Sequence, residues 1–316
     1  MPGAAWPVAA GLAAGLAADA LLGDPQRGHP VAGFGLLAAA LERRVHHDSR
    51  AAGAGYTLVL TGGAAAAGAG LQRALPGPAG RAAVTALATW AVVGGTSLRR
   101  EAATMAGHLD AGDLPAARAR LVHLCGRDPA ALDGAGLARA TVESVAENTS
   151  DAVVGPLVWG AVAGVPGLLA YRAVNTLDAM VGHRSPRYER FGWAAARADD
   201  VANLLPARLT AALAVAFAPV VGGSRAQALR VRRRDGHRHP SPNAGPVEAA
   251  FAGALGRTLG GRLCYAGRVE QRPLLGNGPA PEVADITRAA RLSLAVTVGA
   301  GVLVAGARLL LDRGRR

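Results

Sequence analysis

Three carboxylates stand at four-residue intervals near the middle of the chain: Glu143, Glu147 and Asp151. In a helix, this i, i+4, i+8 spacing places all three on one face. Like charges on one face repel each other, so a helix that keeps them needs a cation opposite, such as magnesium, an arginine cluster or a magnesium-bound polyphosphate. A solvated acidic face is the simpler alternative.

Further polar side chains surround the apolar run that follows these carboxylates. They are amides and acids that lie close to apolar sequence, where unpaired polar groups are costly. The set comprises Asn148, Asn175, Asp178, Asp199, Asp200 and Asn203. So many polar groups beside apolar sequence favour a buried polar site over a solvated surface.

The composition indicates a helical integral membrane protein. Of the 316 residues, 51% are hydrophobic and only 18% are charged. Six segments rich in small residues approach the ~20 residues that a helix needs to cross a bilayer. They are Val8–Leu22, Tyr56–Leu71, Ala82–Leu98, Ala152–Tyr171, Leu209–Val221 and Leu292–Leu311. We predict an all-α, polytopic membrane protein with four to six hydrophobic helices, forming a single domain over residues 1–316. A soluble, alanine-rich helical bundle is the alternative.

The segment Ala152–Tyr171 raises a geometric conflict. If it crosses the bilayer as one straight helix, Glu147 and Asp178 lie on opposite sides and cannot share a site. Pro156, Pro166 and several glycines interrupt the segment. A broken or re-entrant helix would keep both flanks together. We therefore expect some hydrophobic helices to be broken, with the site at the boundary between membrane and water.

The basic residues restrict the chemistry. All 34 basic side chains are arginine, and the sequence contains no lysine. Without lysine there is no Walker A site and no Schiff base, so phosphate must be held by arginine, backbone amides or metal. The net charge of +12 suits anionic substrates or an anionic membrane face. Nucleic acid is not an expected partner, because basic and aromatic residues do not interleave and zinc-finger spacing is absent.

Motifs along nearly the whole chain resemble one family. Each is weak alone, and together they are specific. They are Gly23-Asp-Pro25, His29-Pro-Val31, Glu147-Asn-Thr-Ser-Asp151, Tyr171-Arg-Ala-Val-Asn-Thr-Leu-Asp-Ala-Met-Val-Gly182, Phe191-Gly192, Ala196-Arg-Ala-Asp-Asp-Val-Ala-Asn203, Pro206-Ala-Arg208, Ser241-Pro-Asn-Ala-Gly245 and Leu259-Gly-Gly261. They resemble the CobD/CbiB family of cobalamin biosynthesis, adenosylcobinamide-phosphate synthase. Ala152 and His183 depart from the pattern, where glycine and an aromatic residue are expected.

The resemblance implies a multi-pass enzyme of the inner cell membrane. Such an enzyme joins the f-propionate of adenosylcobyric acid to (R)-1-amino-2-propanol phosphate, or to the free amino alcohol, as an amide. It implies ATP as cosubstrate and Mg²⁺, with the lipid bilayer and other cobalamin-pathway enzymes as partners besides the corrinoid and the aminopropanol phosphate. The chemistry is consistent, because a carboxylate condenses with an amine in water only after activation. Phosphoryl activation needs magnesium, an arginine clamp and a base.

Roles can be assigned on this basis. The candidate magnesium ligands are Glu143, Glu147, Asp151 and Asp178. Glu147, Asp151 and Asp178 are also the candidate catalytic acids, and His29 or His237 is the candidate general base. The basic loop Arg232–His239 would hold the aminopropanol phosphate or contact lipid headgroups. Candidate ligands of phosphate and substrate are Asp24, Asn148, Arg172, Asn175, Arg184, Arg197, Asp199, Asp200, Asn203, Arg208 and Asn243.

Two other functions stay open. In a polytopic transporter or corrinoid-binding membrane protein, the intramembrane acids would line a pathway. Such a protein would move substrate without ATP turnover and without a new amide. In a metal-dependent phosphotransferase acting on a lipid-linked alcohol, the product would be a phosphodiester.

Overall fold

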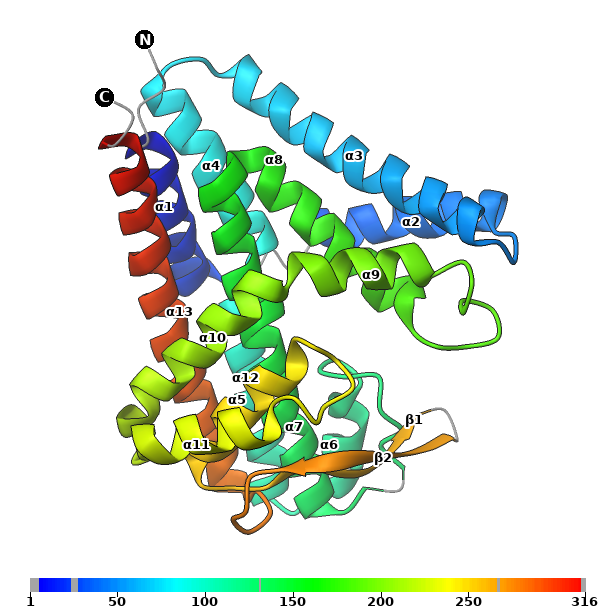
Figure 1. Ribbon diagram of the computed structural model, residues 1–316, viewed down its shortest axis with the longest axis vertical. Coiled ribbons are helices and arrows are strands. Elements are labelled where there is room, and N and C mark those ends of the chain that lie inside the picture. The colour runs from blue at the N-terminus through cyan, green and yellow to red at the C-terminus, as the bar shows by residue number, and fades with distance from the viewer. Residues whose placement is uncertain (1–5, 24–27, 131, 266–267, 314–316) are drawn as a thin grey trace. The chain divides into compact units, whose positions relative to one another are not determined.

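The computed structural model describes residues 6–23, 28–130, 132–265 and 268–313, and helices dominate them (Figure 1). The prediction of an all-α fold is therefore confirmed. Contacts divide the chain into two compact units. The first unit takes its described residues from 1–94, 151–205 and 301–316, and the second consists of 95–150 and 206–300.

The first unit is built from helices with small residues at their contacts. Its elements are α1 (Trp6–Leu22), α2 (Pro30–Val45), α3 (Arg50–Ala74), α4 (Pro78–Val92), α8 (Gly155–Leu177), the π-helical turn η2 (Asp178–Gly182) and α9 (Trp193–Ala202). Helix α1 packs closely on α4 because Gly11 and Gly15 have no side chain. A Cβ on either glycine would lie 2.5 Å from the Cβ of Thr85 or Thr89. Such close approach through small residues is typical of membrane helices.

Helix α8 is broken at Gly164, where φ is 67° and ψ is −148°. Glycine adopts this left-handed region without the steric cost of a Cβ. Its two halves fold back on each other, so that a Cβ on Gly155 would overlap with the Tyr171 hydroxyl. That hydroxyl also lies 3.1 Å from the carbonyl oxygen of Asp151. The predicted break in Ala152–Tyr171 is confirmed, and it brings Tyr171, at the end of this segment, to Asp151, which directly precedes the segment.

The second unit combines helices with one β-hairpin. Its helices are α5 (Gly95–Asp110), α6 (Leu114–Leu121), α7 (Gly134–Thr149), α10 (Leu204–Phe217), the 3₁₀ turn η3 (Ala218–Val221), α11 (Arg225–Asp235), α12 (Ala244–Leu255) and α13 (Val283–Arg313). The first two residues of α10 and the last part of α13 belong to the first unit. The π-helical turn η1 (Ser150–Val154) continues the chain from α7 into α8.

The second unit also contains a β-hairpin, which the prediction of helices alone did not include. Strand β1 (Leu259–Tyr265) pairs in antiparallel fashion with β2 (Arg268–Leu275), with an irregular register between Leu259 and Gly261. Gly260 and Gly261 have φ values of 85° and 90°. These left-handed residues allow a bulge, which bends the strand and re-aims the backbone groups beside it.

Four helical stretches are long and apolar enough to cross a membrane. They are Arg50–Ala74, Gly134–Gly182, Leu204–Val221 and Val283–Leu310. The predicted span Ala82–Leu98 is wrong as a single helix. Helix α4 ends at Val92 and α5 begins at Gly95, because the glycine pair at 94–95 interrupts the helix. The protein is thus a helical membrane protein.

Candidate functional site

Glu143, on α7, is a buried carboxylate of the second unit. Its side chain is 2% exposed and forms an ion pair with Arg127, which is 8% exposed. The Gly260 amide donates a hydrogen bond of 2.6 Å to Glu143 Oε1. A Cβ on Gly260 would overlap with the Pro273 carbonyl, so the bulge that supplies this amide requires glycine. The Leu259-Gly-Gly261 motif therefore serves to hold Glu143.

Glu147 lies one turn further along α7 and differs from Glu143 in its exposure. Its side chain is exposed to solvent. Desolvation by the surrounding protein nevertheless acts most strongly on its carboxyl group, followed by the positive charges of Arg272 and Arg127 and the negative charge of Glu143. The neighbouring Asn148 donates to the Ser144 carbonyl oxygen at 2.9 Å. The four-residue spacing predicted that both glutamates lie on one acidic face of the helix. The structure encloses the side chain of Glu143 and leaves that of Glu147 accessible to solvent.

A second buried carboxylate, Glu248, comes from α12. It is 3% exposed, and its Oε1 lies 3.8 Å from His239 Nε2. Burial and the negative charges of Glu143 and Glu147 raise the pKa of Glu248 well above its usual range. Burial and the charge of Arg272 lower the pKa of His239 to about 4. His239 is therefore neutral at pH 7, and its Nε2 lies 2.8 Å from Arg272 Nη1.

The sequence did not single out Glu248 or Arg272, and it indicated His239 only as the end of the basic loop Arg232–His239. Glu248 stands alone in an apolar helix, which was a usable signal, because an isolated acid in such sequence is rarely buried without a partner. The hairpin that carries Arg272 was not predicted. His239 is separated by one residue from His237, the predicted base.

His239 also lines an arginine-rich pocket of about 510 Å³. The other lining residues are Arg208, Arg232, Arg233, Gly236, His237, Pro240, Pro242 and Pro246. Arg208 Nη1 donates to Asn243 Oδ1 at 2.6 Å, so the structure joins two predicted phosphate ligands. The Nε of Arg232 is buried and has no hydrogen-bond partner within the described residues. We call this cavity the Arg208 pocket.

The Ser241-Pro-Asn-Ala-Gly245 motif shapes one wall of this pocket. Ser241 Oγ accepts hydrogen bonds from the backbone amides of Asn243 and Ala244, which fixes the turn before α12. A Cβ on Gly245 would overlap with the Gly236 carbonyl, so the close approach of α12 to the end of α11 requires glycine here. The motif thereby holds Asn243 where Arg208 can reach it.

The first unit holds a separate polar network around Asp199. Asn203 Nδ2 donates to Asp199 Oδ2 at 3.0 Å, and Asn175 Nδ2 donates to Asp199 Oδ1 at 3.4 Å. Tyr171 donates to Asn203 Oδ1 at 2.7 Å, and Arg172 donates to Asn175 Oδ1 at 3.4 Å. This Asp199 network thus unites four predicted ligands, Arg172, Asn175, Asp199 and Asn203, with Tyr171.

The remaining predicted acids and arginines lie at varied places in the first unit. Asp151 is half-buried at the flank of the broken helix. Asp178 packs against Gly182, where a Cβ would overlap with its carboxylate. Arg197 and Asp200 form an exposed ion pair at 3.3 Å.

Three further predicted residues, His29, Arg184 and Asp24, belong neither to the Arg208 pocket nor to the Asp199 network. His29 caps α2, and its Nδ1 accepts a hydrogen bond of 3.1 Å from the Val31 amide. Arg184 is exposed. Asp24 lies outside the described residues.

The predicted magnesium ligands are divided between the two units: Glu143 and Glu147 belong to the second, and Asp151 and Asp178 belong to the first. No three Asp, Glu, His or Cys side chains come together as a metal site within the described residues. The carboxylate of Glu143 is engaged by Arg127 and by the Gly260 amide, so its contacts fit a structural anchor rather than a metal ligand. Magnesium that arrives with ATP needs only one or two protein carboxylates, because phosphates and waters complete its shell. The exposed Glu147 fits that requirement.

Comparison with known proteins places this sequence in a family. The family described as CobD/Cbib protein matches residues 12–293. The chain is 57% identical over 295 residues to the cobalamin biosynthesis protein CobD of Mycobacterium tuberculosis, which covers 93% of this chain and 94% of that protein. It is 45% identical over 265 residues to the CobD protein of Rhodobacter capsulatus, covering 83% of each chain. No solved structure matches. The chain belongs to the CobD/CbiB family.

Proposed function

We propose that the protein is an adenosylcobinamide-phosphate synthase of the inner cell membrane. It would join the f-propionate of adenosylcobyric acid to (R)-1-amino-2-propanol phosphate as an amide and consume ATP. Membership of the CobD/CbiB family supports the proposal, as do relatives named cobalamin biosynthesis protein CobD. The four membrane-length helical stretches support the location.

The Arg208 pocket is the observation that carries the proposal. A phosphate monoester is an anion, and arginine binds phosphate through paired N–H donors. Arg208, Arg232 and Arg233 surround a volume of about 510 Å³. The buried Nε of Arg232 lacks a protein acceptor within the described residues, which a phosphate oxygen would supply. We assign the phosphate of aminopropanol phosphate to this pocket.

The acidic residues behind the pocket suit the amide-forming step. In that step the substrate carboxylate attacks the γ-phosphorus of ATP and ADP leaves. The amine then displaces phosphate from the acyl carbon and loses a proton to a base. Of the two predicted bases, His237 lines the pocket and is exposed. His29 has its Nδ1 engaged in capping α2, so we assign the base to His237.

Glu147 and the buried pair behind it complete the assignment. Glu147 would hold the magnesium that accompanies ATP. Glu143 is paired with Arg127, and the raised pKa of Glu248 favours its protonated form, so neither carboxyl group would oppose the binding of a phosphate by the pocket arginines. His239, which is neutral at pH 7, contacts both Arg272 and Glu248 through its Nε2 and so links the pocket to this pair.

The Asp199 network is the proposed contact for the corrinoid. Adenosylcobyric acid carries carboxamide side chains, which exchange hydrogen bonds with amides and carboxylates. Asn175, Asp199 and Asn203 offer both kinds of group. Arg172, which donates to Asn175, would bring a guanidinium to the reacting carboxylate.

The test is a product assay on purified, detergent-solubilised protein. Adenosylcobyric acid, aminopropanol phosphate, Mg²⁺ and ATP are supplied, and the corrinoids are analysed by mass spectrometry. The proposal expects a corrinoid that gains aminopropanol phosphate with loss of water only when ATP is present. Binding of corrinoid without product, and its movement across vesicle membranes without ATP turnover, would indicate the transporter instead.

Variants locate the reaction within the chain. Arg232→Gln should raise the KM for aminopropanol phosphate by about tenfold or more, because a charge-assisted hydrogen bond is lost. Glu147→Gln and Asp178→Asn should each reduce amide formation strongly. Arg44→Gln is the matched control, since Arg44 is exposed on α2. Near-normal amide formation by both acid variants would refute their assignment to Mg-ATP while leaving the reaction itself established.

A further inference from the structure

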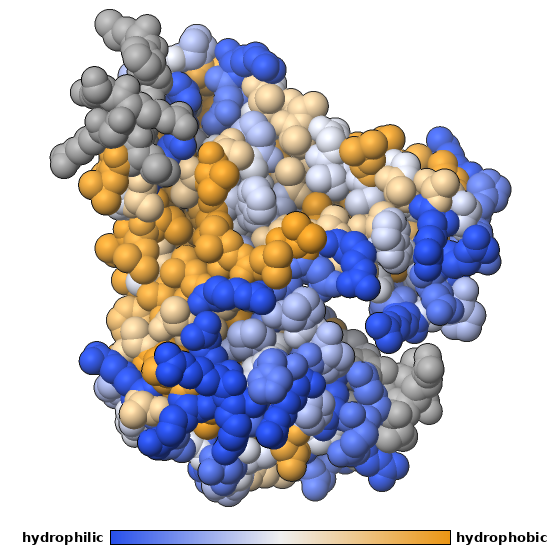
Figure 2. All heavy atoms as spheres, in the orientation of Figure 1, coloured by the Kyte–Doolittle hydropathy of each residue, from blue (hydrophilic) through white to orange (hydrophobic). Residues whose placement is uncertain are grey.

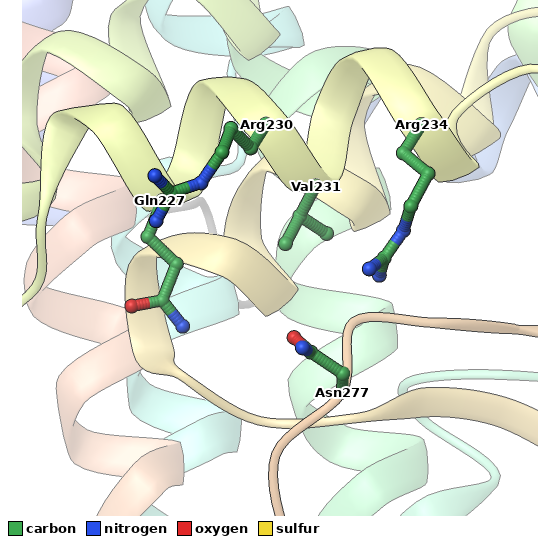
Figure 3. A pocket seen from close by; sticks show the side chains of 5 residues that line it. All are labelled: Gln227, Arg230, Val231, Arg234 and Asn277. Carbon is green, nitrogen blue, oxygen red and sulfur yellow. The ribbon is translucent and has the colours of Figure 1, made fainter.

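A second pocket of about 510 Å³ lies on the other side of α11 from the residues assigned above. Its lining residues are Gln227, Arg230, Val231, Arg234 and Asn277, and it shares none of them with the Arg208 pocket. Figure 3 shows the side chains of Val231 and Arg234 extending from α11 toward the Asn277 side chain, which comes from the loop after β2. We call this cavity the Arg230 pocket.

Arg234 is held in place by a buried carboxylate. Asp235 is fully buried, and its two oxygens accept hydrogen bonds of 2.8 Å and 2.6 Å from Arg234 Nε and Nη2. Asp235 Oδ2 also accepts a hydrogen bond of 2.9 Å from the Gly276 amide, next to Asn277. A guanidinium has five N–H donors, and this fork uses two of them. The remaining donors of a pre-positioned guanidinium can therefore serve an anion at little cost in side-chain entropy.

The other lining groups suit a phosphate group attached to an organic chain. Arg230 stands one helical turn before Arg234 and is exposed, so it adds a second guanidinium to the same face of α11. The amides of Gln227 and Asn277 can donate to further oxygens. Val231 supplies an apolar contact between the polar groups. Two arginines with two amides match an anion rather than a cation or an uncharged sugar.

The sequence position of this pocket puts it at the membrane surface. The candidate span Leu204–Val221 ends six residues before Gln227, and the next span begins at Val283, six residues after Asn277. Because the chain crosses once before this segment and once after it, residues 222–282 lie on one side of the membrane. Arg288 ties the two ends together by donating to the Val221 carbonyl oxygen at 2.9 Å and 3.1 Å.

The surface beside the pocket changes from apolar to basic. Exposed Val220 on η3, and Leu294 and Val298 on α13, present apolar side chains that suit lipid. Figure 2 shows hydrophobic residues over α13 and hydrophilic residues over α11. A basic helix that directly follows a hydrophobic span is placed to meet anionic headgroups, which attract arginine within a Debye length of the surface.

We propose that the Arg230 pocket binds the phosphate of an anionic membrane lipid. A lipid headgroup and a soluble phosphate ester both carry a phosphate with an organic substituent. The membrane spans on both sides of the segment favour the lipid. This site is independent of the amide-forming reaction, since it shares no lining residue with the Arg208 pocket.

The test uses the full chain in detergent micelles, with binding of phosphatidylglycerol followed by native mass spectrometry and phosphatidylcholine as the uncharged comparison. The wild-type protein should bind phosphatidylglycerol in preference. Arg230→Gln should weaken this binding by about fivefold, and Asn277→Asp should weaken it similarly by placing a negative charge in the pocket. Arg225→Gln is the matched control, because Arg225 is an exposed arginine of the same helix outside the pocket. Its binding should stay within about twofold of wild type.

Two outcomes would overturn the proposal. Equal weakening by Arg230→Gln and Arg225→Gln would show a diffuse attraction to the basic helix rather than a site. Binding of glycerol 3-phosphate or aminopropanol phosphate that responds to Arg230→Gln, with no lipid bound, would replace the lipid by a soluble phosphate. Thermal melting of each variant excludes loss of folding as the cause, and Asn277→Asp leaves α11 unchanged.

Discussion

The two units bury their polar groups in different ways. In the first unit, Asp199 is bound by the side-chain amides of Asn175 and Asn203, and Arg172 joins this network through Asn175. In the second unit, the buried Glu143 is neutralised directly by Arg127. An amide network orients its members through geometry, whereas an ion pair in a dry interior depends on charge balance.

The amides around Asp199 therefore fix the local geometry, whereas the stability of the second unit depends on which of its buried groups are ionised. The second unit contains a carboxyl group with a raised pKa, Glu248, and a histidine with a lowered one, His239. Perturbed groups of this kind gather at functional sites, although structural ion pairs also produce them. The contrast predicts that substitutions that remove a charge lower the free energy of unfolding most in the second unit. It also predicts that a change of pH destabilises the second unit before the first.

Arg127→Ala should have the largest effect on stability. It leaves Glu143 buried without a cation and close to two further carboxylates, and breaking such a pair costs about 3–5 kcal/mol. Arg190→Ala is the matched control, because the Arg190–Asp48 pair at 3.5 Å is exposed on both sides and should cost less than about 1 kcal/mol. Denaturant unfolding in detergent, followed by circular dichroism, measures both. Equal losses would show that burial does not distinguish the pairs.

His239 should make the second unit less stable as the pH falls. Its pKa of about 4 in the folded protein is below the ordinary 6.5, so the unfolded chain binds the proton more tightly. The stabilisation is present above pH 6.5 and is lost as the pH falls toward 4, by up to about 3 kcal/mol. Glu248, whose pKa is raised in the folded protein, has the opposite effect and favours the folded state as the pH falls.

The variant His239→Gln isolates this effect. The difference in melting temperature between wild type and His239→Gln should shrink or reverse from pH 7 to pH 4. His123→Gln, which removes an exposed histidine of the same unit, should follow the wild-type curve. Parallel curves for wild type and His239→Gln would mean that His239 does not titrate with a lowered pKa.

Tyr171→Phe should have the smallest of these effects. It removes the hydrogen bond of 2.7 Å to Asn203, whose side chain is buried, without changing any charge. The expected cost is about 1 kcal/mol, because hydrogen bonds between membrane helices are modest. Thr104→Val, which removes an exposed hydrogen bond within α5, is the control and should cost less than about 0.5 kcal/mol. A loss as large as that of Arg127→Ala would erase the contrast between the units.

Local signals predicted much of the fold. The apolar segments around α3, α8, α10 and α13 became membrane-length helical stretches. The prolines and glycines of Ala152–Tyr171 predicted a break, and Gly164 provides it. The β-hairpin was missed, because a glycine pair is as typical of a loop as of a bulge. The predicted span Ala82–Leu98 proved to be two helices, because the helix propensity of a glycine pair does not by itself show whether a helix ends there.

The candidate site was predicted in part. Arg208 with Asn243, and Asn175 with Asp199 and Asn203, were expected as ligands and lie together. His29 was a candidate base, but its side chain caps a helix. Glu248 and Arg272 were missed, and His239 was named only within the basic loop, because nothing in the spacing of single residues links α12 to the hairpin. The catalytic roles assigned to the predicted residues stay predictions.

The sequence by itself determined the residue types available for chemistry, the absence of lysine, the apolar helices and the family motifs. These follow from composition and from patterns within a few helical turns. Only the tertiary structure decided that Glu143 is an anchor while Glu147 is exposed, although both share one face of α7. The reason is that Glu143 is held by Gly260, 117 residues away, and burial at that distance depends on how the chain packs rather than on local pattern.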